Sequence, residues 1–209
     1  MERIIGLDGE MSGADFHSGH RLIQIGVALD TDKNGNRLDV PLVFESLIGW
    51  PEDQLIWSPS AEAVHRIPIE EVLSAPPAYE VDAALTDWLW VNGITPKNRR
   101  FHVLTGFNVG RFDSIFLERD LPHSFKYFSR RYADLNPFLF AFASSLGQYS
   151  GTPRNSSQWK DVLNNAGHDL LSQTSHNKPE HNAATDAILA LGAWRKIETI
   201  LSQLDSSHS

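Results

Sequence analysis

The 209-residue sequence contains no cysteine, so a disulfide framework and a thiolate metal site are both excluded. Any bound metal ion must therefore be held by oxygen or imidazole. Long apolar runs are also missing, because none approaches the roughly 20 residues that a membrane helix needs. The opening residues, from Met1 to Ile5, lack the basic and apolar segments of a secretory signal. We therefore expect a cytoplasmic protein that does not contact membranes.

Basic residues are fewer than acidic ones, with 18 Lys and Arg against 26 Asp and Glu. The net charge of −8 argues against salt-driven binding to long duplex nucleic acid. However, residues 94–131 are basic, and this segment is either a solvated face or a surface that contacts phosphates. Its eight cationic side chains are Lys97, Arg99, Arg100, Arg111, Arg119, Lys126, Arg130 and Arg131.

Length and composition fit one globular unit, because 41% of the residues are hydrophobic and can form a core. We predict a single domain over residues 1–209, with a frayed tail at 205–209. Short apolar runs between turn residues predict strands at 3–9, 22–29, 40–48, 101–107 and 132–135. Helical periodicity predicts helices at 61–65, 69–73, 79–92, 111–119, 137–146, 159–166 and 182–204, with a loop at 147–158.

The order of these elements predicts the fold class. Asp32-Lys33-Asn34-Gly35-Asn36 has the composition of a hairpin loop, so the first three strands should form an antiparallel meander. Later strands alternate with helices, which favours parallel pairing. Pro122 is expected to end the helix before it. The sequence thus predicts an α/β protein with a mixed five-stranded sheet, an antiparallel meander followed by parallel strands, flanked by helices.

Two carboxylates follow the first apolar strand, at Asp8 and Glu10. Side chains two residues apart on a strand point to the same face, so these two can converge on one hard cation such as Mg²⁺ or Mn²⁺. A single Asp-x-Glu pair is a weak signal, but the buried strand that leads into this pair favours a site over a solvated face.

Two further acidic positions open helices. Asp113 falls in the first turn after a strand and a Gly-containing turn, where the helix dipole alone would stabilise a carboxylate. His181 precedes Asn182, a plausible N-cap, and Asp186 follows one turn inside the last helix. With His181 in the loop, the imidazole and the Asp186 carboxylate can converge; alternatively, His181 is a surface residue.

Taken together, these three motifs resemble the histidine-containing branch of the Asp-Glu-Asp-Asp (DEDDh) 3′–5′ exonuclease superfamily. The resemblance spans about residues 3–200. Glu10-Met11-Ser12-Gly13 and the spacing from Asn108 to Asp113 are similar to oligoribonucleases, whereas Phe112 before Asp113 is similar to the proofreading and RNase T-like enzymes. The family implies an RNase H-like fold, and it implies that the protein hydrolyses single-stranded or short DNA or RNA to 5′-mononucleotides.

The resemblance also implies roles for individual residues. Asp8, Glu10, Asp113 and Asp186 would bind two Mg²⁺ or Mn²⁺ ions, with Asp8 bridging both. His181 would take a proton from the attacking water, and Glu10 would belong to the catalytic set. The residues expected to bind the nucleotide are Met11, Ser12, Asn108 and Phe112. Core packing is an alternative for Met11 and Phe112, and His65 is read as a structural histidine.

Two other functions remain open at this point. The chain could be a catalytically inactive nuclease-fold module that binds nucleic acid, although all five motif residues are present. It could also be a phosphoesterase that acts on small nucleotides. A homodimer is possible because some members of the family pair.

Overall fold

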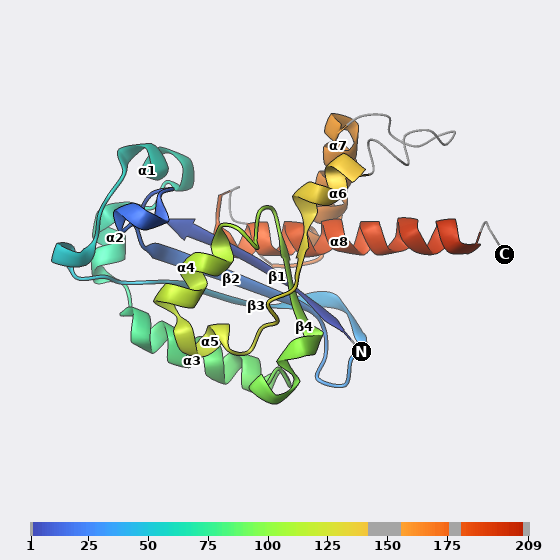
Figure 1. The fold of residues 1–209 in the computed structure, drawn as a ribbon, viewed down its shortest axis with the longest axis horizontal. Helices are drawn as coiled ribbons and strands as arrows, with labels where there is room; N and C mark the ends of the chain where they lie inside the picture. The colour runs from blue at the N-terminus through green and yellow to red at the C-terminus, as the bar shows by residue number, and fades with distance from the viewer. Residues whose placement is uncertain (1, 142–155, 176–180, 207–209) are drawn as a thin grey trace.

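The computed structural model describes residues 2–141, 156–175 and 181–206, which contain one mixed sheet with the strand order β3-β2-β1-β4-β5 (Figure 1). Neighbouring strands pair antiparallel from β3 to β1, and β4 and β5 continue parallel to β1. The predicted mixed five-stranded sheet is therefore confirmed. The strands are β1 (Arg3–Met11), β2 (Leu22–Thr31), β3 (Arg37–Leu47), β4 (His102–Gly106) and β5 (Tyr132–Asp134).

The turn between β2 and β3 has the predicted chemistry. The Asp32 carboxylate accepts hydrogen bonds from the backbone N–H groups of Asn34 (2.8 Å) and Asn36 (2.9 Å). Gly35 supplies the left-handed conformation at φ +85°. This compact loop fixes the meander, in which Thr31 pairs with Arg37.

Helices cover both faces of the sheet. α8 packs along one face against β1 and β2, whereas α3 and α4 lie on the other face and α5 packs beside them (Figure 1). α6 and α7 pack on α8, whose C-terminal half projects beyond the sheet. The helices are α1 (Pro59–His65), α2 (Ile69–Ser74), α3 (Ala78–Val91), α4 (Asp113–Asp120), α5 (Pro122–Phe125), α6 (Leu135–Ala141), α7 (Ser156–Leu171) and α8 (Ala183–Ser206), with 3₁₀ turns η1 (Phe16–Ser18), η2 (Glu52–Gln54) and η3 (Pro96–Phe101).

The side chains of β1 alternate between the main core on one face of the sheet and α8 on the other face. Ile5 and Leu7 are fully or almost fully buried in the core that α3 and α4 close. The residues between and after them, Gly6, Asp8 and Glu10, point to the opposite face, toward α8. The strand thus presents two carboxylates to α8 while its other side is buried in the core.

One helix prediction around a proline is confirmed and one was wrong. The helix before Pro122 ends at Asp120, as expected; Pro122 is also the first residue of the short helix α5, which was not predicted and where its missing N–H costs nothing. α6 begins at Leu135, ahead of the predicted start at Pro137, because proline is tolerated in a first helical turn. The predicted remainder of this helix, 142–146, lies outside the described residues.

The last two helices are longer than predicted. α7 begins at Ser156, so the predicted loop is wrong for 156–158, while 147–155 lie outside the described residues. Buried Trp159 and Leu163 anchor α7 on α8. α8 continues to Ser206, so 205 and 206 of the expected tail are helical. Across residues 2–141, 156–175 and 181–206, no helix is both long and apolar enough to span a membrane.

Arg119 in the basic segment has a structural role. It is bonded to buried Asp120 (2.7 Å) and stacks over the Phe16 ring, with its guanidinium carbon 4.4 Å from the centroid. Asp120 also accepts hydrogen bonds from the Leu22 N–H (2.9 Å) and from Arg21 (3.1 Å). These contacts of Asp120 hold the end of α4 against the start of β2.

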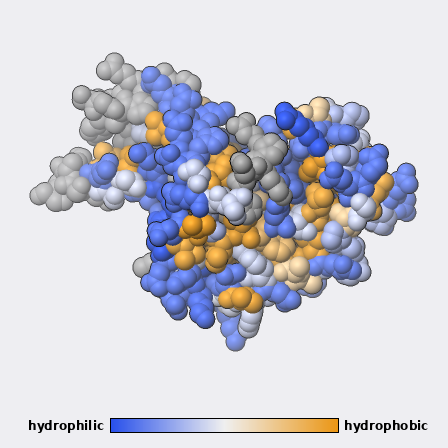
Figure 2. Space-filling model, turned by 180° about the vertical axis from the view of Figure 1, so that it is seen from behind, coloured by the Kyte–Doolittle hydropathy of each residue, from blue (hydrophilic) through white to orange (hydrophobic). Residues whose placement is uncertain are grey.

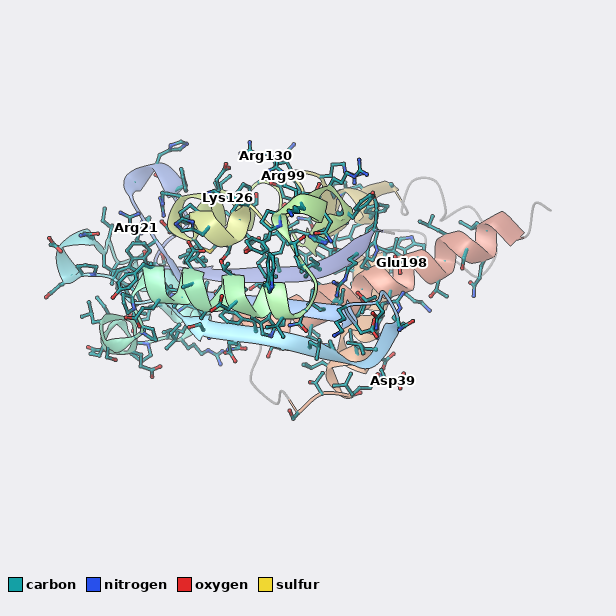
Figure 3. All side chains as sticks on the ribbon, turned by 90° about the horizontal axis from the view of Figure 1, so that it is seen from below. Arg21, Asp39, Arg99, Lys126, Arg130 and Glu198 are labelled. Carbon is teal, nitrogen blue, oxygen red and sulfur yellow. The ribbon has the colours of Figure 1, made fainter. Side chains whose placement is uncertain are left out.

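Other basic side chains form a surface cluster. Arg99, Lys126 and Arg130 gather beside α4 and α5 (Figure 3) and line a cavity of about 230 Å³. Arg130 is paired with Glu118 on α4, so part of the positive charge is neutralised. Seen from behind, apolar residues gather in patches across the middle of the molecule, with hydrophilic residues around them (Figure 2).

Candidate active site

The approach of α8 to the sheet depends on two glycines. Gly26 lies opposite Asp8 in the β1–β2 register, and a Cβ there would be 2.1 Å from the carbonyl oxygen of Ala183. A Cβ on Gly6 would be 2.2 Å from the carbonyl oxygen of Ala187. These contacts are too short for any side chain, so glycine lets the first turns of α8 lie directly on the strands. Asp186, in that part of α8, is thereby brought to β1.

Four carboxylates meet where β1, α4 and α8 converge. The carboxylates of Asp113, Asp186 and Glu10 are all close enough to repel the Asp8 carboxylate. Those of Asp186 and Asp113 also repel the Glu10 carboxylate. The predicted convergence of residues far apart in the sequence is therefore observed.

Asp113 is tied directly to the strand that carries the first two acids. Its carboxylate accepts a hydrogen bond from the Gly9 N–H at 3.1 Å, and Gly9 lies between Asp8 and Glu10. The side chain is only 5% exposed, at the N-terminal end of α4. The Gly9 N–H thus holds Asp113 beside Asp8 and Glu10.

His181 lies at the third corner of the cluster. It precedes α8 in a left-handed conformation (φ +62°), which histidine adopts more readily than most residues. One donor atom each from Glu10, His181 and Asp186 lies within 4.8 Å of the other two. The imidazole is exposed to solvent, so it is accessible to a bound substrate or water.

The electrostatics of the cluster favour a cation. Burial, followed by repulsion from Asp113, Asp186 and Glu10, raises the pKa of Asp8 well above its usual value. Burial and repulsion from Asp186 and Asp113 raise the pKa of Glu10 to about 8, and burial raises that of Asp113 to about 7. Hard carboxylate oxygens with one imidazole suit Mg²⁺ or Mn²⁺, which would relieve the repulsion.

A fifth carboxylate, Asp134, was not predicted from the sequence. It ends β5 and accepts hydrogen bonds from the backbone N–H groups of Asn108 (3.2 Å) and Asn136 (3.1 Å). Its charge also raises the pKa of Asp113. Asp134 therefore fixes the β4–α4 loop that delivers Asp113. Its position at the end of the predicted strand 132–135 was the available signal.

A polar network that fixes the start of α8 was also missed. The Gln24 side-chain oxygen accepts a hydrogen bond from the Ala183 N–H (3.1 Å), and its amide nitrogen donates to Glu45 (3.1 Å). The Asn182 side chain donates to the same Glu45 oxygen at 2.7 Å. Gln24 on β2 and Glu45 on β3 thus fix Asn182 and Ala183, the two residues that follow His181. Gln24 lies opposite Glu10 in the β1–β2 register, which only the assembled sheet shows.

Asn182 caps α8 as predicted, with its side-chain oxygen accepting a hydrogen bond from the Thr185 N–H at 3.2 Å. We expect Asn182→Ala to lower the free energy of unfolding by about 1 kcal/mol, because the cap and the bond to Glu45 are both lost. Urea denaturation would measure the loss. Asn165→Ala, at an exposed position within α7, is the matched control and should be neutral or slightly stabilising. Equal stability of the two variants would contradict this role.

The residues expected to bind a nucleotide have different surroundings. Met11 is 5% exposed and belongs to the core cluster, and Ser12 is fully buried with its hydroxyl accepting from the Arg21 N–H at 2.9 Å. Phe112 is half-buried against Phe116, with ring centroids 5.4 Å apart. Asn108 is exposed. Met11, Ser12 and Phe112 therefore have packing or hydrogen-bonding roles.

Only one of the two ring nitrogens of His65 has a hydrogen-bond partner among the described residues. Its Nδ1 accepts a hydrogen bond from the Ile67 N–H at 3.0 Å, and its ring packs edge-on against Trp57. Its buried Nε2 has no hydrogen-bond partner among the described residues. Burial lowers the pKa of His65, which keeps the imidazole neutral.

No protein-family model matches the sequence, and no curated protein sequence matches it. Solved structures do share its fold. *Escherichia coli* exonuclease I in complex with a dT13 oligonucleotide aligns with a TM-score of 0.60 and 16% identity, covering 99% of this chain. The chain spans 43% of the length of that exonuclease.

Two further solved structures are similar as well. *S. pombe* Pop2p, in its Mg²⁺- and Mn²⁺-bound form, aligns with a TM-score of 0.59 and 16% identity over 94% of this chain and 82% of its own. Cell-death related nuclease 4 gives 0.62 and 15% over 95% of this chain and 64% of its own. These likenesses show the fold, and they confirm the predicted RNase H-like architecture.

Proposed function

We propose that the protein is a metal-dependent 3′–5′ exonuclease of the DEDDh type that releases 5′-mononucleotides from single-stranded or short nucleic acid. The observation that carries the proposal is the convergence of Asp8, Glu10, Asp113 and Asp186 beside His181, from three separate elements. The fold shared with known exonucleases supports it.

The four carboxylates would hold Mg²⁺ or Mn²⁺, and Pop2p is a similar structure in a Mg²⁺- and Mn²⁺-bound form. Bound divalent ions supply positive charge that offsets the charge developing on the phosphate and on the leaving oxygen. Asp8 is central to this group, because Asp113, Asp186 and Glu10 all repel its carboxylate, and it would hold the ions together with these three acids. Asp134 adds negative charge behind Asp113.

His181 is the proposed general base. It accepts the proton of the attacking water as the water oxygen bonds to phosphorus. The bond from phosphorus to the 3′ oxygen of the preceding nucleotide breaks, and that oxygen takes up a proton. The products are a 5′-mononucleotide and a strand one residue shorter. The left-handed backbone at His181 and the fixed start of α8 would hold the imidazole toward Glu10 and Asp186.

Capture of the terminal nucleotide is proposed for the surroundings of β1 and α4. The candidates are the backbone after Glu10 and the side chains of Met11, Asn108 and Phe112. Met11 follows Glu10 directly, Phe112 precedes Asp113 directly, and Asn108 lies in the loop that leads to Asp113. Ser12 contributes by fixing the β1–β2 connection through the Arg21 N–H.

End-labelled DNA and RNA oligonucleotides of two and of about twenty residues test the function directly. With Mg²⁺ or Mn²⁺ we expect stepwise shortening from the 3′ end, and EDTA should abolish it because the carboxylates then lack their cations. The time course is followed on a denaturing gel. Tight binding without shortening under either metal would favour an inactive nucleic-acid-binding module, and it would overturn the proposal.

A further inference from the structure

Three exposed cations surround a small cavity beside α4 and α5. Arg99, Lys126 and Arg130 line this basic cavity of about 230 Å³ (Figure 3). Its wall also includes Phe125 and Phe128, which are buried. The guanidinium carbon of Arg130 lies 5.7 Å from the centroid of the Phe125 ring. The cavity thus presents positive charge to solvent above an apolar wall.

Two of the three cations are not neutralised by the fold. The side chains of Arg99 and Lys126 have no hydrogen-bond or ion-pair partner among residues 2–141, 156–175 and 181–206. Arg130 is paired with Glu118, whose side chain is 48% exposed. Three cations and the carboxylate of Glu118 give the lining a net charge of +2, in a chain whose net charge is −8. The cavity is therefore suited to an anionic ligand.

The basic cavity is joined to the carboxylate cluster by two segments. On α4, Glu118 follows Asp113 by five residues, a rise of roughly 7.5 Å along the helix. Arg130 precedes Asp134 by four residues, which span at most about 14 Å of extended chain. Asp134 is close enough to Asp113 to raise its pKa. A strand whose 3′ end lies at the carboxylates can therefore extend to the cavity.

We infer that the basic cavity binds backbone phosphates of the nucleic-acid strand upstream of the cleaved bond. The inference rests on the proposed function. Exposed Lys and Arg side chains that neutralise phosphates release counterions, and they bind the strand without reading its bases. At the duplex rise of about 3.4 Å per nucleotide, a separation of about 14 Å corresponds to about four nucleotides.

The cavity makes longer single strands the preferred substrates. A dinucleotide has a single phosphodiester, which must lie at the carboxylates to be cleaved. No phosphate then remains for Arg99, Lys126 and Arg130, whereas a strand of about twenty nucleotides can occupy both places at once.

The double variant Arg99→Gln/Lys126→Gln tests the cavity in the full chain. We expect kcat/KM on a 20-nucleotide single strand to fall about 10-fold or more at about 50 mM salt, because two phosphate contacts are lost. The slope of log kcat/KM against log salt concentration should become shallower by about 1.4, which is about 0.7 for each lost contact. On a dinucleotide, kcat/KM should stay within about two-fold of the wild type.

Glu118→Gln should have the opposite effect, because it releases Arg130 from its ion pair without removing a cation. We expect kcat/KM on the 20-nucleotide strand to rise about two-fold or more, since a third cation becomes available to the phosphates. The dinucleotide should be cleaved at the wild-type rate. Loss of a contact that only stabilises the fold would not raise kcat/KM.

Lys33→Gln/Lys196→Gln is the matched control, because it removes two positive charges at exposed positions in the β2–β3 turn and on α8. Both substrates should stay within about two-fold of the wild type, since charges beyond a Debye length are largely screened. An equal loss on both substrate lengths in the Arg99/Lys126 variant would overturn the inference. An equal loss in the control would overturn it as well.

Fluorescence anisotropy keeps the cavity testable if the wild type cleaves nothing. A labelled 20-nucleotide single strand is titrated with each protein in EDTA at about 50 mM salt. The Kd should rise about 10-fold or more in the Arg99/Lys126 variant and should fall in Glu118→Gln. These shifts without cleavage would reject the exonuclease proposal but retain the cavity. Cleavage by a wild type whose Kd equals that of both variants would reject only the cavity.

Polyglutamate of the same length is the competitor that distinguishes an acidic protein segment from a nucleic acid. We expect it to displace the labelled strand less effectively than an unlabelled strand does, because the cavity is continuous with the carboxylate cluster. Tighter binding of polyglutamate than of the strand, lost in the Arg99/Lys126 variant, would assign the cavity to an acidic protein partner and overturn the inference.

Discussion

Replacement of Asp186 by asparagine is expected to lower kcat/KM for mononucleotide release at least about 10³-fold, with the fold intact. The substitution preserves the shape of the side chain but removes a charge that acts on both Asp8 and Glu10. It also removes one carboxylate ligand from the candidate metal-binding group of Glu10, His181 and Asp186. A loss of about 4 kcal/mol in transition-state stabilisation, reasonable for a metal ligand, corresponds to this factor.

The effect would be measured by single-turnover cleavage of an end-labelled oligonucleotide in saturating Mg²⁺ and Mn²⁺. Asp161→Asn, an identical change at an exposed position of α7, is the control and should cleave at the wild-type rate. Circular dichroism and the thermal midpoint report whether each variant is folded. A folded Asp186→Asn protein with activity within ten-fold of the wild type would remove this residue from the mechanism.

The sequence predicted the centre of the site because that part depends on local rules. Alternation along β1 puts Asp8 and Glu10 on one face, and Asn182 behaves as a helix N-cap whether or not the rest of the fold is known. The glycines at positions 6 and 26 are different, since their role depends on how closely α8 approaches the sheet. No local sequence pattern predicts how closely α8 approaches the sheet.

The supporting residues were missed for the same reason. Gln24, Glu45 and Asn182 are far apart in the chain and meet only once β2, β3 and α8 are assembled. Asp134 is the last residue of a three-residue strand, which is too short to give a clear period, and its partners are backbone N–H groups. Buried polar contacts between distant segments are decided by tertiary packing, which propensity and periodicity do not describe.

The carboxylate cluster should also destabilise the metal-free protein, and Asp8→Asn should therefore stabilise it while abolishing cleavage. Asp8 is repelled by Asp113, Asp186 and Glu10 in a buried setting. Replacing it with a neutral isostere removes one of the four charges. We expect the metal-free protein to gain about 2 kcal/mol at pH 8, because a buried carboxylate without a positive partner is removed. The thermal midpoint should then rise by about 4–8 °C.

The pH dependence follows from the raised pKa values. The pKa of Glu10 rises from 4.5 to about 8 and that of Asp113 from 3.8 to about 7 on folding. Between about pH 8 and pH 4.5 the folded state therefore binds more protons than the unfolded state, and the metal-free protein gains stability as the pH falls. The advantage of Asp8→Asn should be largest at pH 8 and should shrink toward pH 5.

Thermal unfolding in EDTA at pH 8 and pH 5, with and without added Mn²⁺, measures both effects. Mn²⁺ should stabilise the wild type at pH 8 because the cation binds the ionised carboxylates, and it should stabilise Asp8→Asn much less. Asp161→Asn serves again as the control, and its midpoint should follow the wild type throughout. If Asp8→Asn were no more stable than the wild type in EDTA at pH 8, repulsion within the cluster could not be a cost of the metal-free fold. The case for a cation at this site would then rest on the donor geometry of Glu10, His181 and Asp186 alone.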